Sequence, residues 1–268
     1  MADDWIPGVD LTLPNSARMY DFFLGGKNYF PADVAAARRV LHLQPLIQPS
    51  SRENRHALRR MVTHLTDLGI RQFLDIGAGL PTTGNVHEVA PDARVVYVDN
   101  DPVVITHAQA LMAGTGTDKV RVVYGDARRP DDILAHPDVD GFLDFAQPIV
   151  LLMIGVLHFV VDDEDAYRVV GTFRDALPPG SYLAITHGCT EGFGAEIVHQ
   201  VVQAYRSSAV PTQLRTAAQI GRFFDGVDMI EPGLVPITEW RPDGIGEGIT
   251  AEEVGIYGGV AHVPASAA

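Results

Sequence analysis

The feature that most constrains the fold is a short apolar run that ends in a glycine-rich turn. Residues 73–81 read FLDIGAGLP, so the run from Phe73 to Ile76 is followed at once by Gly77 and Gly79. A run of this length bounded by glycines is typical of a buried parallel strand. Two glycines in three residues let the backbone turn sharply and lie close to a ligand, because neither carries a Cβ atom. The segment predicts a strand of an α/β sheet that ends at a ligand-binding turn.

The residues around this turn discriminate between nucleotide-type ligands. A dinucleotide-binding turn has a third glycine, G-x-G-x-x-G, and presents a helix N-terminus to a pyrophosphate. Here Thr82 occupies the third glycine position, and Asp75 precedes the turn, where its charge would repel a pyrophosphate. Asp99 follows Gly79 at about the spacing of a ribose-binding acid. An acid at the turn suits a ligand with an ammonium group and no phosphate, and S-adenosylmethionine (SAM) is such a ligand.

Apolar runs alternate with helical patterns from Arg71 onward, which predicts a mostly parallel sheet. The expected strands are 73–76, 95–98, 120–124, 148–154 and 181–186. Ligands of open α/β sheets bind at the carboxyl ends of such strands. Segments 227–231 and 235–240 are expected to form an antiparallel hairpin, because the Pro-Gly turn between them is too short for a parallel connection.

Several motifs, spread over nearly the whole chain, are similar to those of one known family. They are SARMYDFFLGGKN (16–28), RQFLDIG (71–77), NVHEVA (85–90), VYVDNDP (96–102), VLH (156–158), LPPGSY (177–182) and EPGLVP (231–236). On these motifs the chain resembles a bacterial family of SAM-dependent methyltransferases that was long catalogued as a domain of unknown function. The resemblance implies a class I, Rossmann-like α/β fold and SAM as the cofactor. It implies no substrate.

Residues at the strand ends are expected to bind SAM. They are Asp75, Gly77, Gly79, Asp99, Asn100, Asp126 and Ala127. We expect Asp99 to accept hydrogen bonds from the ribose hydroxyls. Asp126 follows the third strand, where the methyltransferase fold implies a contact with the adenine amino group, and Ala127 would donate its backbone N–H to the ring. The alternative for Asp126 is a helix N-cap.

Residues 1–69 are expected to form a helical cap ahead of a SAM-binding domain, 70–262, which a tail, 263–268, follows. Three helices are expected in the cap. They are 16–24, ended by Gly25 and Gly26, 31–40, begun by Pro31, and 50–68, with Ser50 and Glu53 as a capping box.

Five aromatic residues lie within positions 20–30 of this cap. One interpretation makes them core packing. The other makes the segment a lid over SAM, in which Tyr20, Gly25 and Gly26 line the pocket and Lys27 or Arg18 pairs with the methionine carboxylate. Two residues of the third helix, Arg52 and Asn54, are further candidates for that carboxylate.

The need for a catalytic side chain depends on the acceptor. Methyl transfer from a sulfonium is accelerated mainly by alignment of donor and acceptor. A base is needed only where the acceptor has a proton that must leave. His158, just after the fourth strand, is the candidate for this base, and His187, after the fifth, occupies a similar position. For both, the alternative is a structural histidine.

Charge and cysteine content restrict the function further. With 34 acidic against 20 basic residues, the net charge of −14 disfavours nucleic acid as a partner. Four arginines between 52 and 60 are expected to form a solvated helix face. No apolar run is long enough to span a membrane, no cluster of metal ligands is present, and the single cysteine, Cys189, fits a reducing cytoplasm.

Together these observations predict a cytoplasmic SAM-dependent methyltransferase that acts on a small molecule. A non-catalytic, regulatory SAM-binding protein is the first alternative. An NAD-type oxidoreductase is the second, and the absent third glycine argues against it.

Overall fold

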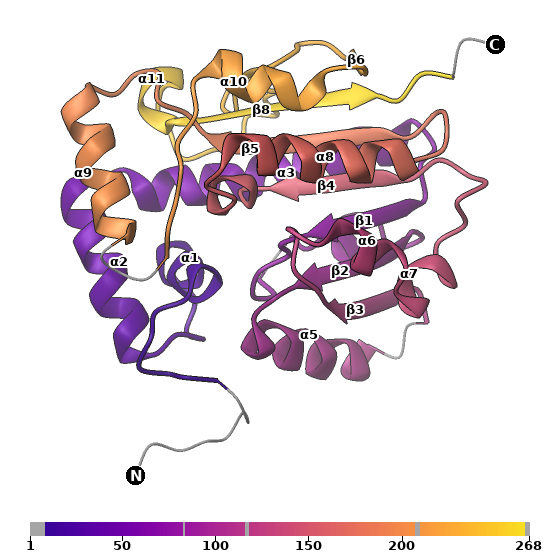
Figure 1. The fold of residues 1–268 in the computed structure, drawn as a ribbon, viewed down its shortest axis with the longest axis horizontal. Helices are drawn as coiled ribbons and strands as arrows, with labels where there is room; N and C mark the ends of the chain where they lie inside the picture. Colours follow the sequence, from indigo (N-terminus) through magenta and orange to yellow (C-terminus); the bar gives the residue numbers. More distant parts are fainter. Residues whose placement is uncertain (1–8, 83, 116–117, 207–209, 266–268) are drawn as a thin grey trace.

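One mixed sheet forms the centre of the protein (Figure 1). The computed structural model describes residues 9–82, 84–115, 118–206 and 210–265. Within them the strand order is β3-β2-β1-β4-β5-β8-β6, and β7 also pairs with β8. The strands are β1 (Gln72–Ile76), β2 (Arg94–Asp99), β3 (Val120–Tyr124), β4 (Val150–Ile154), β5 (Tyr182–Gly188), β6 (Asp228–Met229), β7 (Val235–Pro236) and β8 (Ile256–His262). The neighbouring strands among β1 to β5 pair in parallel and β8 is antiparallel to β5, which confirms the expected sheet class.

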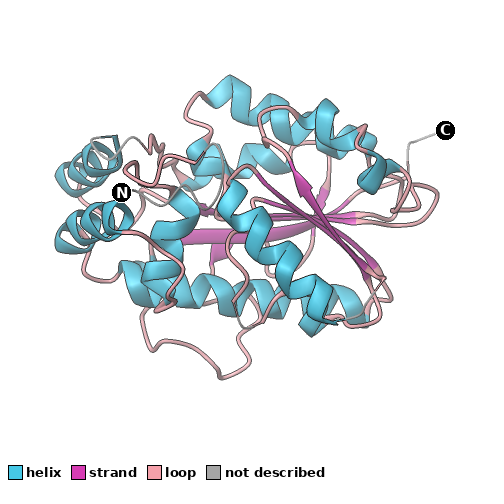
Figure 2. Ribbon diagram, turned by 90° about the horizontal axis from the view of Figure 1, so that it is seen from below, coloured by secondary structure: helices cyan, strands magenta, loops and turns pink. Residues whose placement is uncertain are grey.

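Helices cover both faces of this sheet (Figure 2). They are α1 (Ser16–Leu24), α2 (Pro31–Leu43), α3 (Ile47–Asp67), α4 (Val86–Val89), α5 (Pro102–Thr115), α6 (Pro130–Leu134), α7 (Pro137–Asp140), α8 (Asp163–Ala176), α9 (Ala195–Arg206), α10 (Ala217–Gly221) and α11 (Ala251–Val254), with single 3₁₀ turns η1 (Leu157–Phe159) and η2 (Arg222–Phe224). Among the described residues, none of the helices is both long and apolar enough to cross a membrane.

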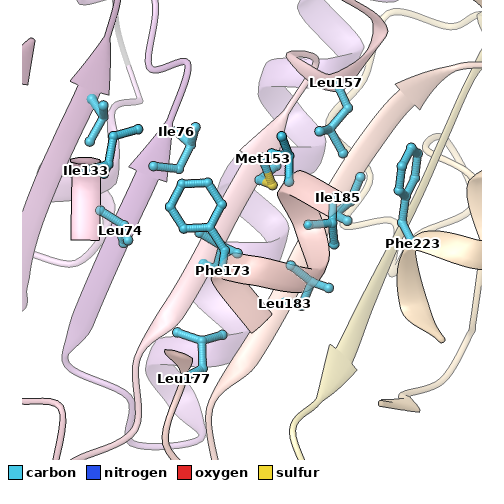
Figure 3. Packing of buried hydrophobic residues seen from close by; sticks show 14 of the residues in the cluster. Leu74, Ile76, Ile133, Met153, Leu157, Phe173, Leu177, Leu183, Ile185 and Phe223 are labelled. Carbon is cyan, nitrogen blue, oxygen red and sulfur yellow. The ribbon is translucent and has the colours of Figure 1, made fainter. Parts of the chain in front are cut away.

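The core is divided by the sheet into two main layers. Strand β1 is buried along its whole length, as expected for a central parallel strand. Leu74 packs on one side with Phe173 of α8 (Figure 3). Phe73 packs on the other side with Leu58 and Met61 of α3. Side chains alternate across a strand, so Asp75 extends to the same side as Phe73, towards α3.

A third group of apolar residues forms a cap beside the sheet, where α1, α2 and α9 lie together (Figure 1). We call this group the cap cluster. Its residues are Met19, Phe23, Ala36, Ala37, Val40, Ala204 and Val210, with Phe22, Leu43, Ile47, Phe159 and Tyr205 packed against them. The cap therefore joins the N-terminal helices to α9, which is more than 150 residues away in the sequence, whereas most of α3 packs on the sheet.

The C-terminal hairpin predicted from the sequence is wrong. Strands β6 and β7 do not pair with each other, because each pairs with β8, a strand that the sequence analysis did not foresee. Two glycines in β8, which weaken a strand pattern in the sequence, explain why it was not foreseen. A Cβ atom on Gly258 would lie 2.9 Å from a methyl of Thr186, and one on Gly259 would lie 2.7 Å from Met229. The glycines that resemble a loop in the sequence are needed for close packing inside the sheet.

The helix boundaries in the cap are partly as expected. Helix α1 begins and ends as predicted, and Gly25 caps it in the left-handed conformation with φ of 81°. The capping box of Ser50 and Glu53 is wrong, because α3 begins at Ile47 and both residues lie inside it. Glu53 instead forms a buried ion pair with Arg60 at 3.0 Å.

Candidate active site

A cavity of about 410 Å³ lies between the cap and the carboxyl ends of the parallel strands. Its volume is in the range of small-molecule pockets. The turns after β1 and β4 line it, and these strands are neighbours at which the order of the sheet reverses. In open α/β sheets, ligands bind at such a reversal.

Two glycines shape the floor of the cavity. Gly77, after β1, has φ of 75°, and a Cβ atom on it would overlap Val156. Gly155, after β4, has φ of 67°, and a Cβ atom on it would lie 3.1 Å from Nδ2 of Asn54. Both positions require glycine for conformation and for space, so the two turns lie close together and leave the backbone open to a ligand.

Asp99 is fixed between two backbone segments that border the cavity. Its Oδ2 accepts a hydrogen bond of 2.9 Å from the N–H of Gly79, and its Oδ1 accepts one of 2.9 Å from the N–H of Asp101. Burial raises the pKa of Asp99 to about 6, although these bonds oppose the shift. The carboxylate is therefore held in place at the end of β2 before any ligand binds.

Asp75 is a buried acid without an ion-pair partner among the described residues. Burial raises its pKa to about 7, which the positive charge of Arg55 opposes and the negative charge of Asp99 increases. Arg55 is near but uses its guanidinium to donate a 3.1 Å hydrogen bond to Asn85. A cationic ligand in the cavity would favour the ionised form of Asp75, which is the chemistry that the ammonium group of SAM provides.

Helix α3 presents a polar face to the cavity. The hydroxyl of Tyr20 donates to the carbonyl of Ser51 at 2.9 Å and accepts from Asn54 at 3.1 Å. Four buried polar atoms of cavity-lining residues have no partner among the described residues. They are Ser50 Oγ, Asn54 Oδ1, Arg55 Nε and His158 Nδ1. Buried polar atoms nearly always have a partner, so these four atoms in the wall are available for hydrogen bonds to a polar ligand.

The structure brings together all seven strand-end residues predicted to bind SAM, and Tyr20 joins them in the lining. Asp126 also has a partner within the chain, because both its oxygens accept hydrogen bonds from the side chain of Arg128. This arginine holds the pKa of Asp126 below its usual value. The next helix, α6, has Arg129 at its N-cap, so the alternative interpretation of Asp126 as an N-cap is wrong.

Gly25, Gly26 and Lys27 do not line the cavity, contrary to the lid hypothesis. Gly25 ends α1, and its N–H bonds the carbonyls of Asp21 and Phe22. A Cβ atom on Gly26 would overlap the carboxylate of Asp21. The glycine pair therefore serves the helix end, and Lys27 is exposed to solvent.

The two arginines proposed for the methionine carboxylate also lie outside the lining. Arg18 is buried, with its Nε 3.3 Å from Asp101 and 3.6 Å from Asp33, so it ties the cap to the start of α5. Arg52 forms an ion pair with Glu247 at 2.7 Å. Each guanidinium is held by carboxylates of the chain, which leaves Arg55 as the α3 arginine in the lining, beside Asn54.

His158 lines the cavity on η1, directly after β4. Burial and the charge of Arg215 lower its pKa to about 4, so the imidazole is neutral at pH 7. Its ring lies 4.2 Å from that of Phe159, measured between centroids. Its Nδ1 is buried without a hydrogen-bond partner in the described part of the chain, which separates His158 from a histidine whose ring is fixed by the fold.

His187 has the structural role that was the alternative for it. Its Nδ1 is 2.8 Å from the carbonyl of Gly188, and its Nε2 is 2.9 Å from a guanidinium nitrogen of Arg215. The fully buried Arg215 also donates to the carbonyls of Leu157 and Val160. Arg215 thus fixes both ends of the turn that contains His158.

Sequence reasoning missed two parts of the site. The sequence predicts a solvated face for Arg55, yet Arg55 lies at helical spacing (i−4, i+3 and i+7) from the buried Ser51, Leu58 and Val62, and that periodicity was the available signal. Residues of α9 and of segment 210–214 also line the cavity. No local sequence pattern indicates that they do.

Comparison with known proteins agrees with this geometry. A sequence model of a family described as S-adenosyl methyltransferase matches residues 5–264. A DUF574 family protein from Streptomyces avermitilis is 41% identical, with a TM-score of 0.90 over 95% of this chain and 99% of its own. A protein from Thermobifida fusca that is assigned to the methyltransferases is 40% identical, with a TM-score of 0.89 over 97% and 98%. The sequence has no significant match among curated proteins.

A more distant structure shares the fold alone. The N-methyltransferase NodS from Bradyrhizobium japonicum, in complex with S-adenosylhomocysteine (SAH), is 15% identical with a TM-score of 0.50 over 87% of this chain and 98% of its own.

The fold and the site define a class I SAM-dependent methyltransferase. The chain belongs to the S-adenosyl methyltransferase family, and its cofactor is SAM.

Proposed function

We propose that the protein transfers a methyl group from SAM to a small molecule held in the cavity between the strand ends and the cap. The observation that supports this most is the pair of buried acids, Asp75 and Asp99, beside a turn that only glycines can form. When bound, SAM supplies a methyl group that its sulfonium sulfur has already activated.

The residues at the strand ends would hold the donor. Asp99, fixed by two backbone N–H groups, would accept from the ribose hydroxyls. Asp126 and Ala127 would contact the adenine. Asp75 would face the positive charge of the donor. The unpartnered atoms of Asn54 and Arg55 would bind polar groups at its methionine end.

The cap would exclude water and position the acceptor. Tyr20 joins α1 to α3 through its two hydrogen bonds, and the cap cluster covers the cavity from the side of α9. Alignment in a dry site provides most of the acceleration of this kind of transfer. His158 would take a proton from an acceptor that has one to lose.

Charge and cysteine content support the proposed acceptor class and a cytoplasmic location. The net charge of −14 supports a small molecule over nucleic acid. The single thiol, Cys189, is buried, which is compatible with the cytoplasm.

The test is methyl transfer from SAM with a radiolabelled methyl group into a bacterial metabolite extract. We expect label in one or a few small products, and much less of it with an Asp99→Ala variant at a SAM concentration near the wild-type Kd. Binding of SAM without any labelled product would instead indicate a non-catalytic, regulatory SAM-binding protein.

A further inference from the structure

The cavity has two parts with different chemistry. The strand-end part contains the acids and glycines described above. We call the other part the cap chamber. It is lined by the members of the cap cluster that reach the cavity, which are Met19, Phe23, Ile47, Phe159, Tyr205 and Val210. These residues come from α1, α3, η1, α9 and the segment after α9, so the chamber exists only in the folded cap.

The cap chamber carries no charge. None of the described residues that line it is Asp, Glu, Lys or Arg. Burial raises the pKa of Tyr20 and of Tyr205, so both phenols stay neutral. His158 at its edge is neutral as well, because its pKa is lowered to about 4. An ionic group placed among these side chains would lose its hydration without an ion-pair partner in the chamber lining, although the positive charge of Arg55 acts on Tyr20 at its border.

The side chains of the lining favour a ligand with an aromatic ring. Three aromatic side chains, Phe23, Phe159 and Tyr205, share the chamber with the thioether of Met19. Aromatic rings and thioether sulfur both pack favourably against an aromatic ring.

One polar group marks the boundary between the two parts of the cavity. The His158 ring is beside Phe159 of the chamber, and its Cε1 lies 3.9 Å from the point where a Cβ atom on Gly155 would be. Its Nδ1 is buried without a partner. A neutral imidazole has one nitrogen that accepts a hydrogen bond, and a hydroxyl is a suitable donor for it.

We propose, resting on the function proposed above, that the methyl acceptor is an uncharged aromatic molecule whose hydroxyl group faces His158. In the transfer, the hydroxyl oxygen bonds to the methyl carbon, the carbon–sulfur bond breaks with its electron pair on sulfur, and the hydroxyl proton goes to His158 and then to solvent. A carboxylate or a protonated alkylamine would bring an ion into the uncharged chamber.

The test measures binding of three naphthalenes of matched size to the full-length protein saturated with SAH. The probes are 2-naphthol, 2-naphthoate and 2-(aminomethyl)naphthalene. Isothermal calorimetry measures the affinity of each. We expect 2-naphthol to bind at least about tenfold more tightly than either ion, since burying an unpaired charge costs more than burying a bonded hydroxyl. Equal or tighter binding of either ion, or no binding of 2-naphthol up to its solubility limit, would overturn the proposal.

A second measurement tests the hydroxyl contact. Wild-type protein should prefer 2-naphthol to 2-methylnaphthalene by about tenfold, the value of one hydrogen bond. His158→Phe should lose this preference, and His199→Gln, an exposed histidine of α9, should keep it. A preference that persists in His158→Phe, with SAH binding intact as evidence of folding, would assign the hydroxyl to another partner and refute the contact.

The experiment distinguishes a wrong acceptor class from a wrong cofactor site. The SAH titration that precedes the naphthalenes tests the cofactor site alone. If SAH binds and the ions are preferred, only the acceptor class is wrong. If SAH does not bind, the methyltransferase assignment of the site fails, whatever the naphthalenes do.

Discussion

The affinity of the protein for SAH should depend on pH through Asp75. Burial raises the pKa of this carboxyl to about 7 in the ligand-free site, with Arg55 opposing the shift and Asp99 adding to it. The ammonium group of SAH favours the ionised carboxylate, so binding below pH 7 must expel a proton. Affinity should therefore rise as the pH rises towards 7 and level off above it.

The magnitude follows from the fraction of Asp75 that is ionised before binding. With a pKa of about 7, this fraction is about a tenth at pH 6 and about nine tenths at pH 8. The association constant should thus increase about tenfold over this interval, which corresponds to about 1.4 kcal/mol. Below pH 6 the dependence should steepen, because the pKa of Asp99 is raised to about 6.

Isothermal calorimetry with SAH between pH 5.5 and 8 measures this dependence. Titration at pH 6 in buffers that differ in ionisation enthalpy counts the expelled protons, and we expect nearly one. Asp75→Asn, which keeps the size of the side chain, should bind more weakly and show little pH dependence between pH 6.5 and 8. Wild-type affinity that is constant with pH, or that increases on acidification, would refute the reasoning.

Three further changes test other parts of the site. Asp99→Ala should weaken SAH binding by about 2–3 kcal/mol, the value of hydrogen bonds to a charged acceptor. The control variant Asp92→Ala, at an exposed ion pair, should bind SAH as the wild type does. Equal SAH affinities of the two variants would remove Asp99 from the site. Asp126→Asn should reduce the preference for SAH over its analogue without the adenine amino group, and an unchanged ratio of Kd values would leave Asp126 only its bond to Arg128. Arg215→Gln should lower the Tm by at least about 5 °C, because it leaves buried carbonyls without a donor and removes the ion pair with the partly exposed Asp163, and an unchanged Tm would contradict that role.

The parts of the site that could be predicted from the sequence are those encoded locally. The turn at Gly77 and Gly79, the acid at the end of β2 and the helix end at Gly25 each depend on a few consecutive residues. Such segments adopt the same conformation in many contexts, so the residue pattern was sufficient. The strand ends could then be placed together because parallel strands share one carboxyl edge.

The remaining parts depend on residues that are distant in the sequence. Gly258 and Gly259 resemble a loop until Thr186 and Met229 are placed against them. The charges of Lys27 and Arg18 suit a carboxylate, but the fold directs Lys27 to solvent and holds Arg18 between Asp33 and Asp101. Tertiary packing decided these positions, and no local pattern contained it.

The cap shows the same limit. Its second half comes from α9, whose sequence gives no sign that it would contact α2. The acceptor side of the cavity was therefore invisible in the sequence, although the cofactor side was not.

A crystal structure of the full chain with SAH tests the central claim most directly, because it locates the cofactor and the acceptor space together. We predict that the ribose hydroxyls lie within hydrogen-bond distance of the Asp99 carboxylate and that the sulfur faces the side of the cavity where His158 lies. SAH bound away from the ends of β1 and β2, or bound with its sulfur turned away from the cap chamber, would contradict the account.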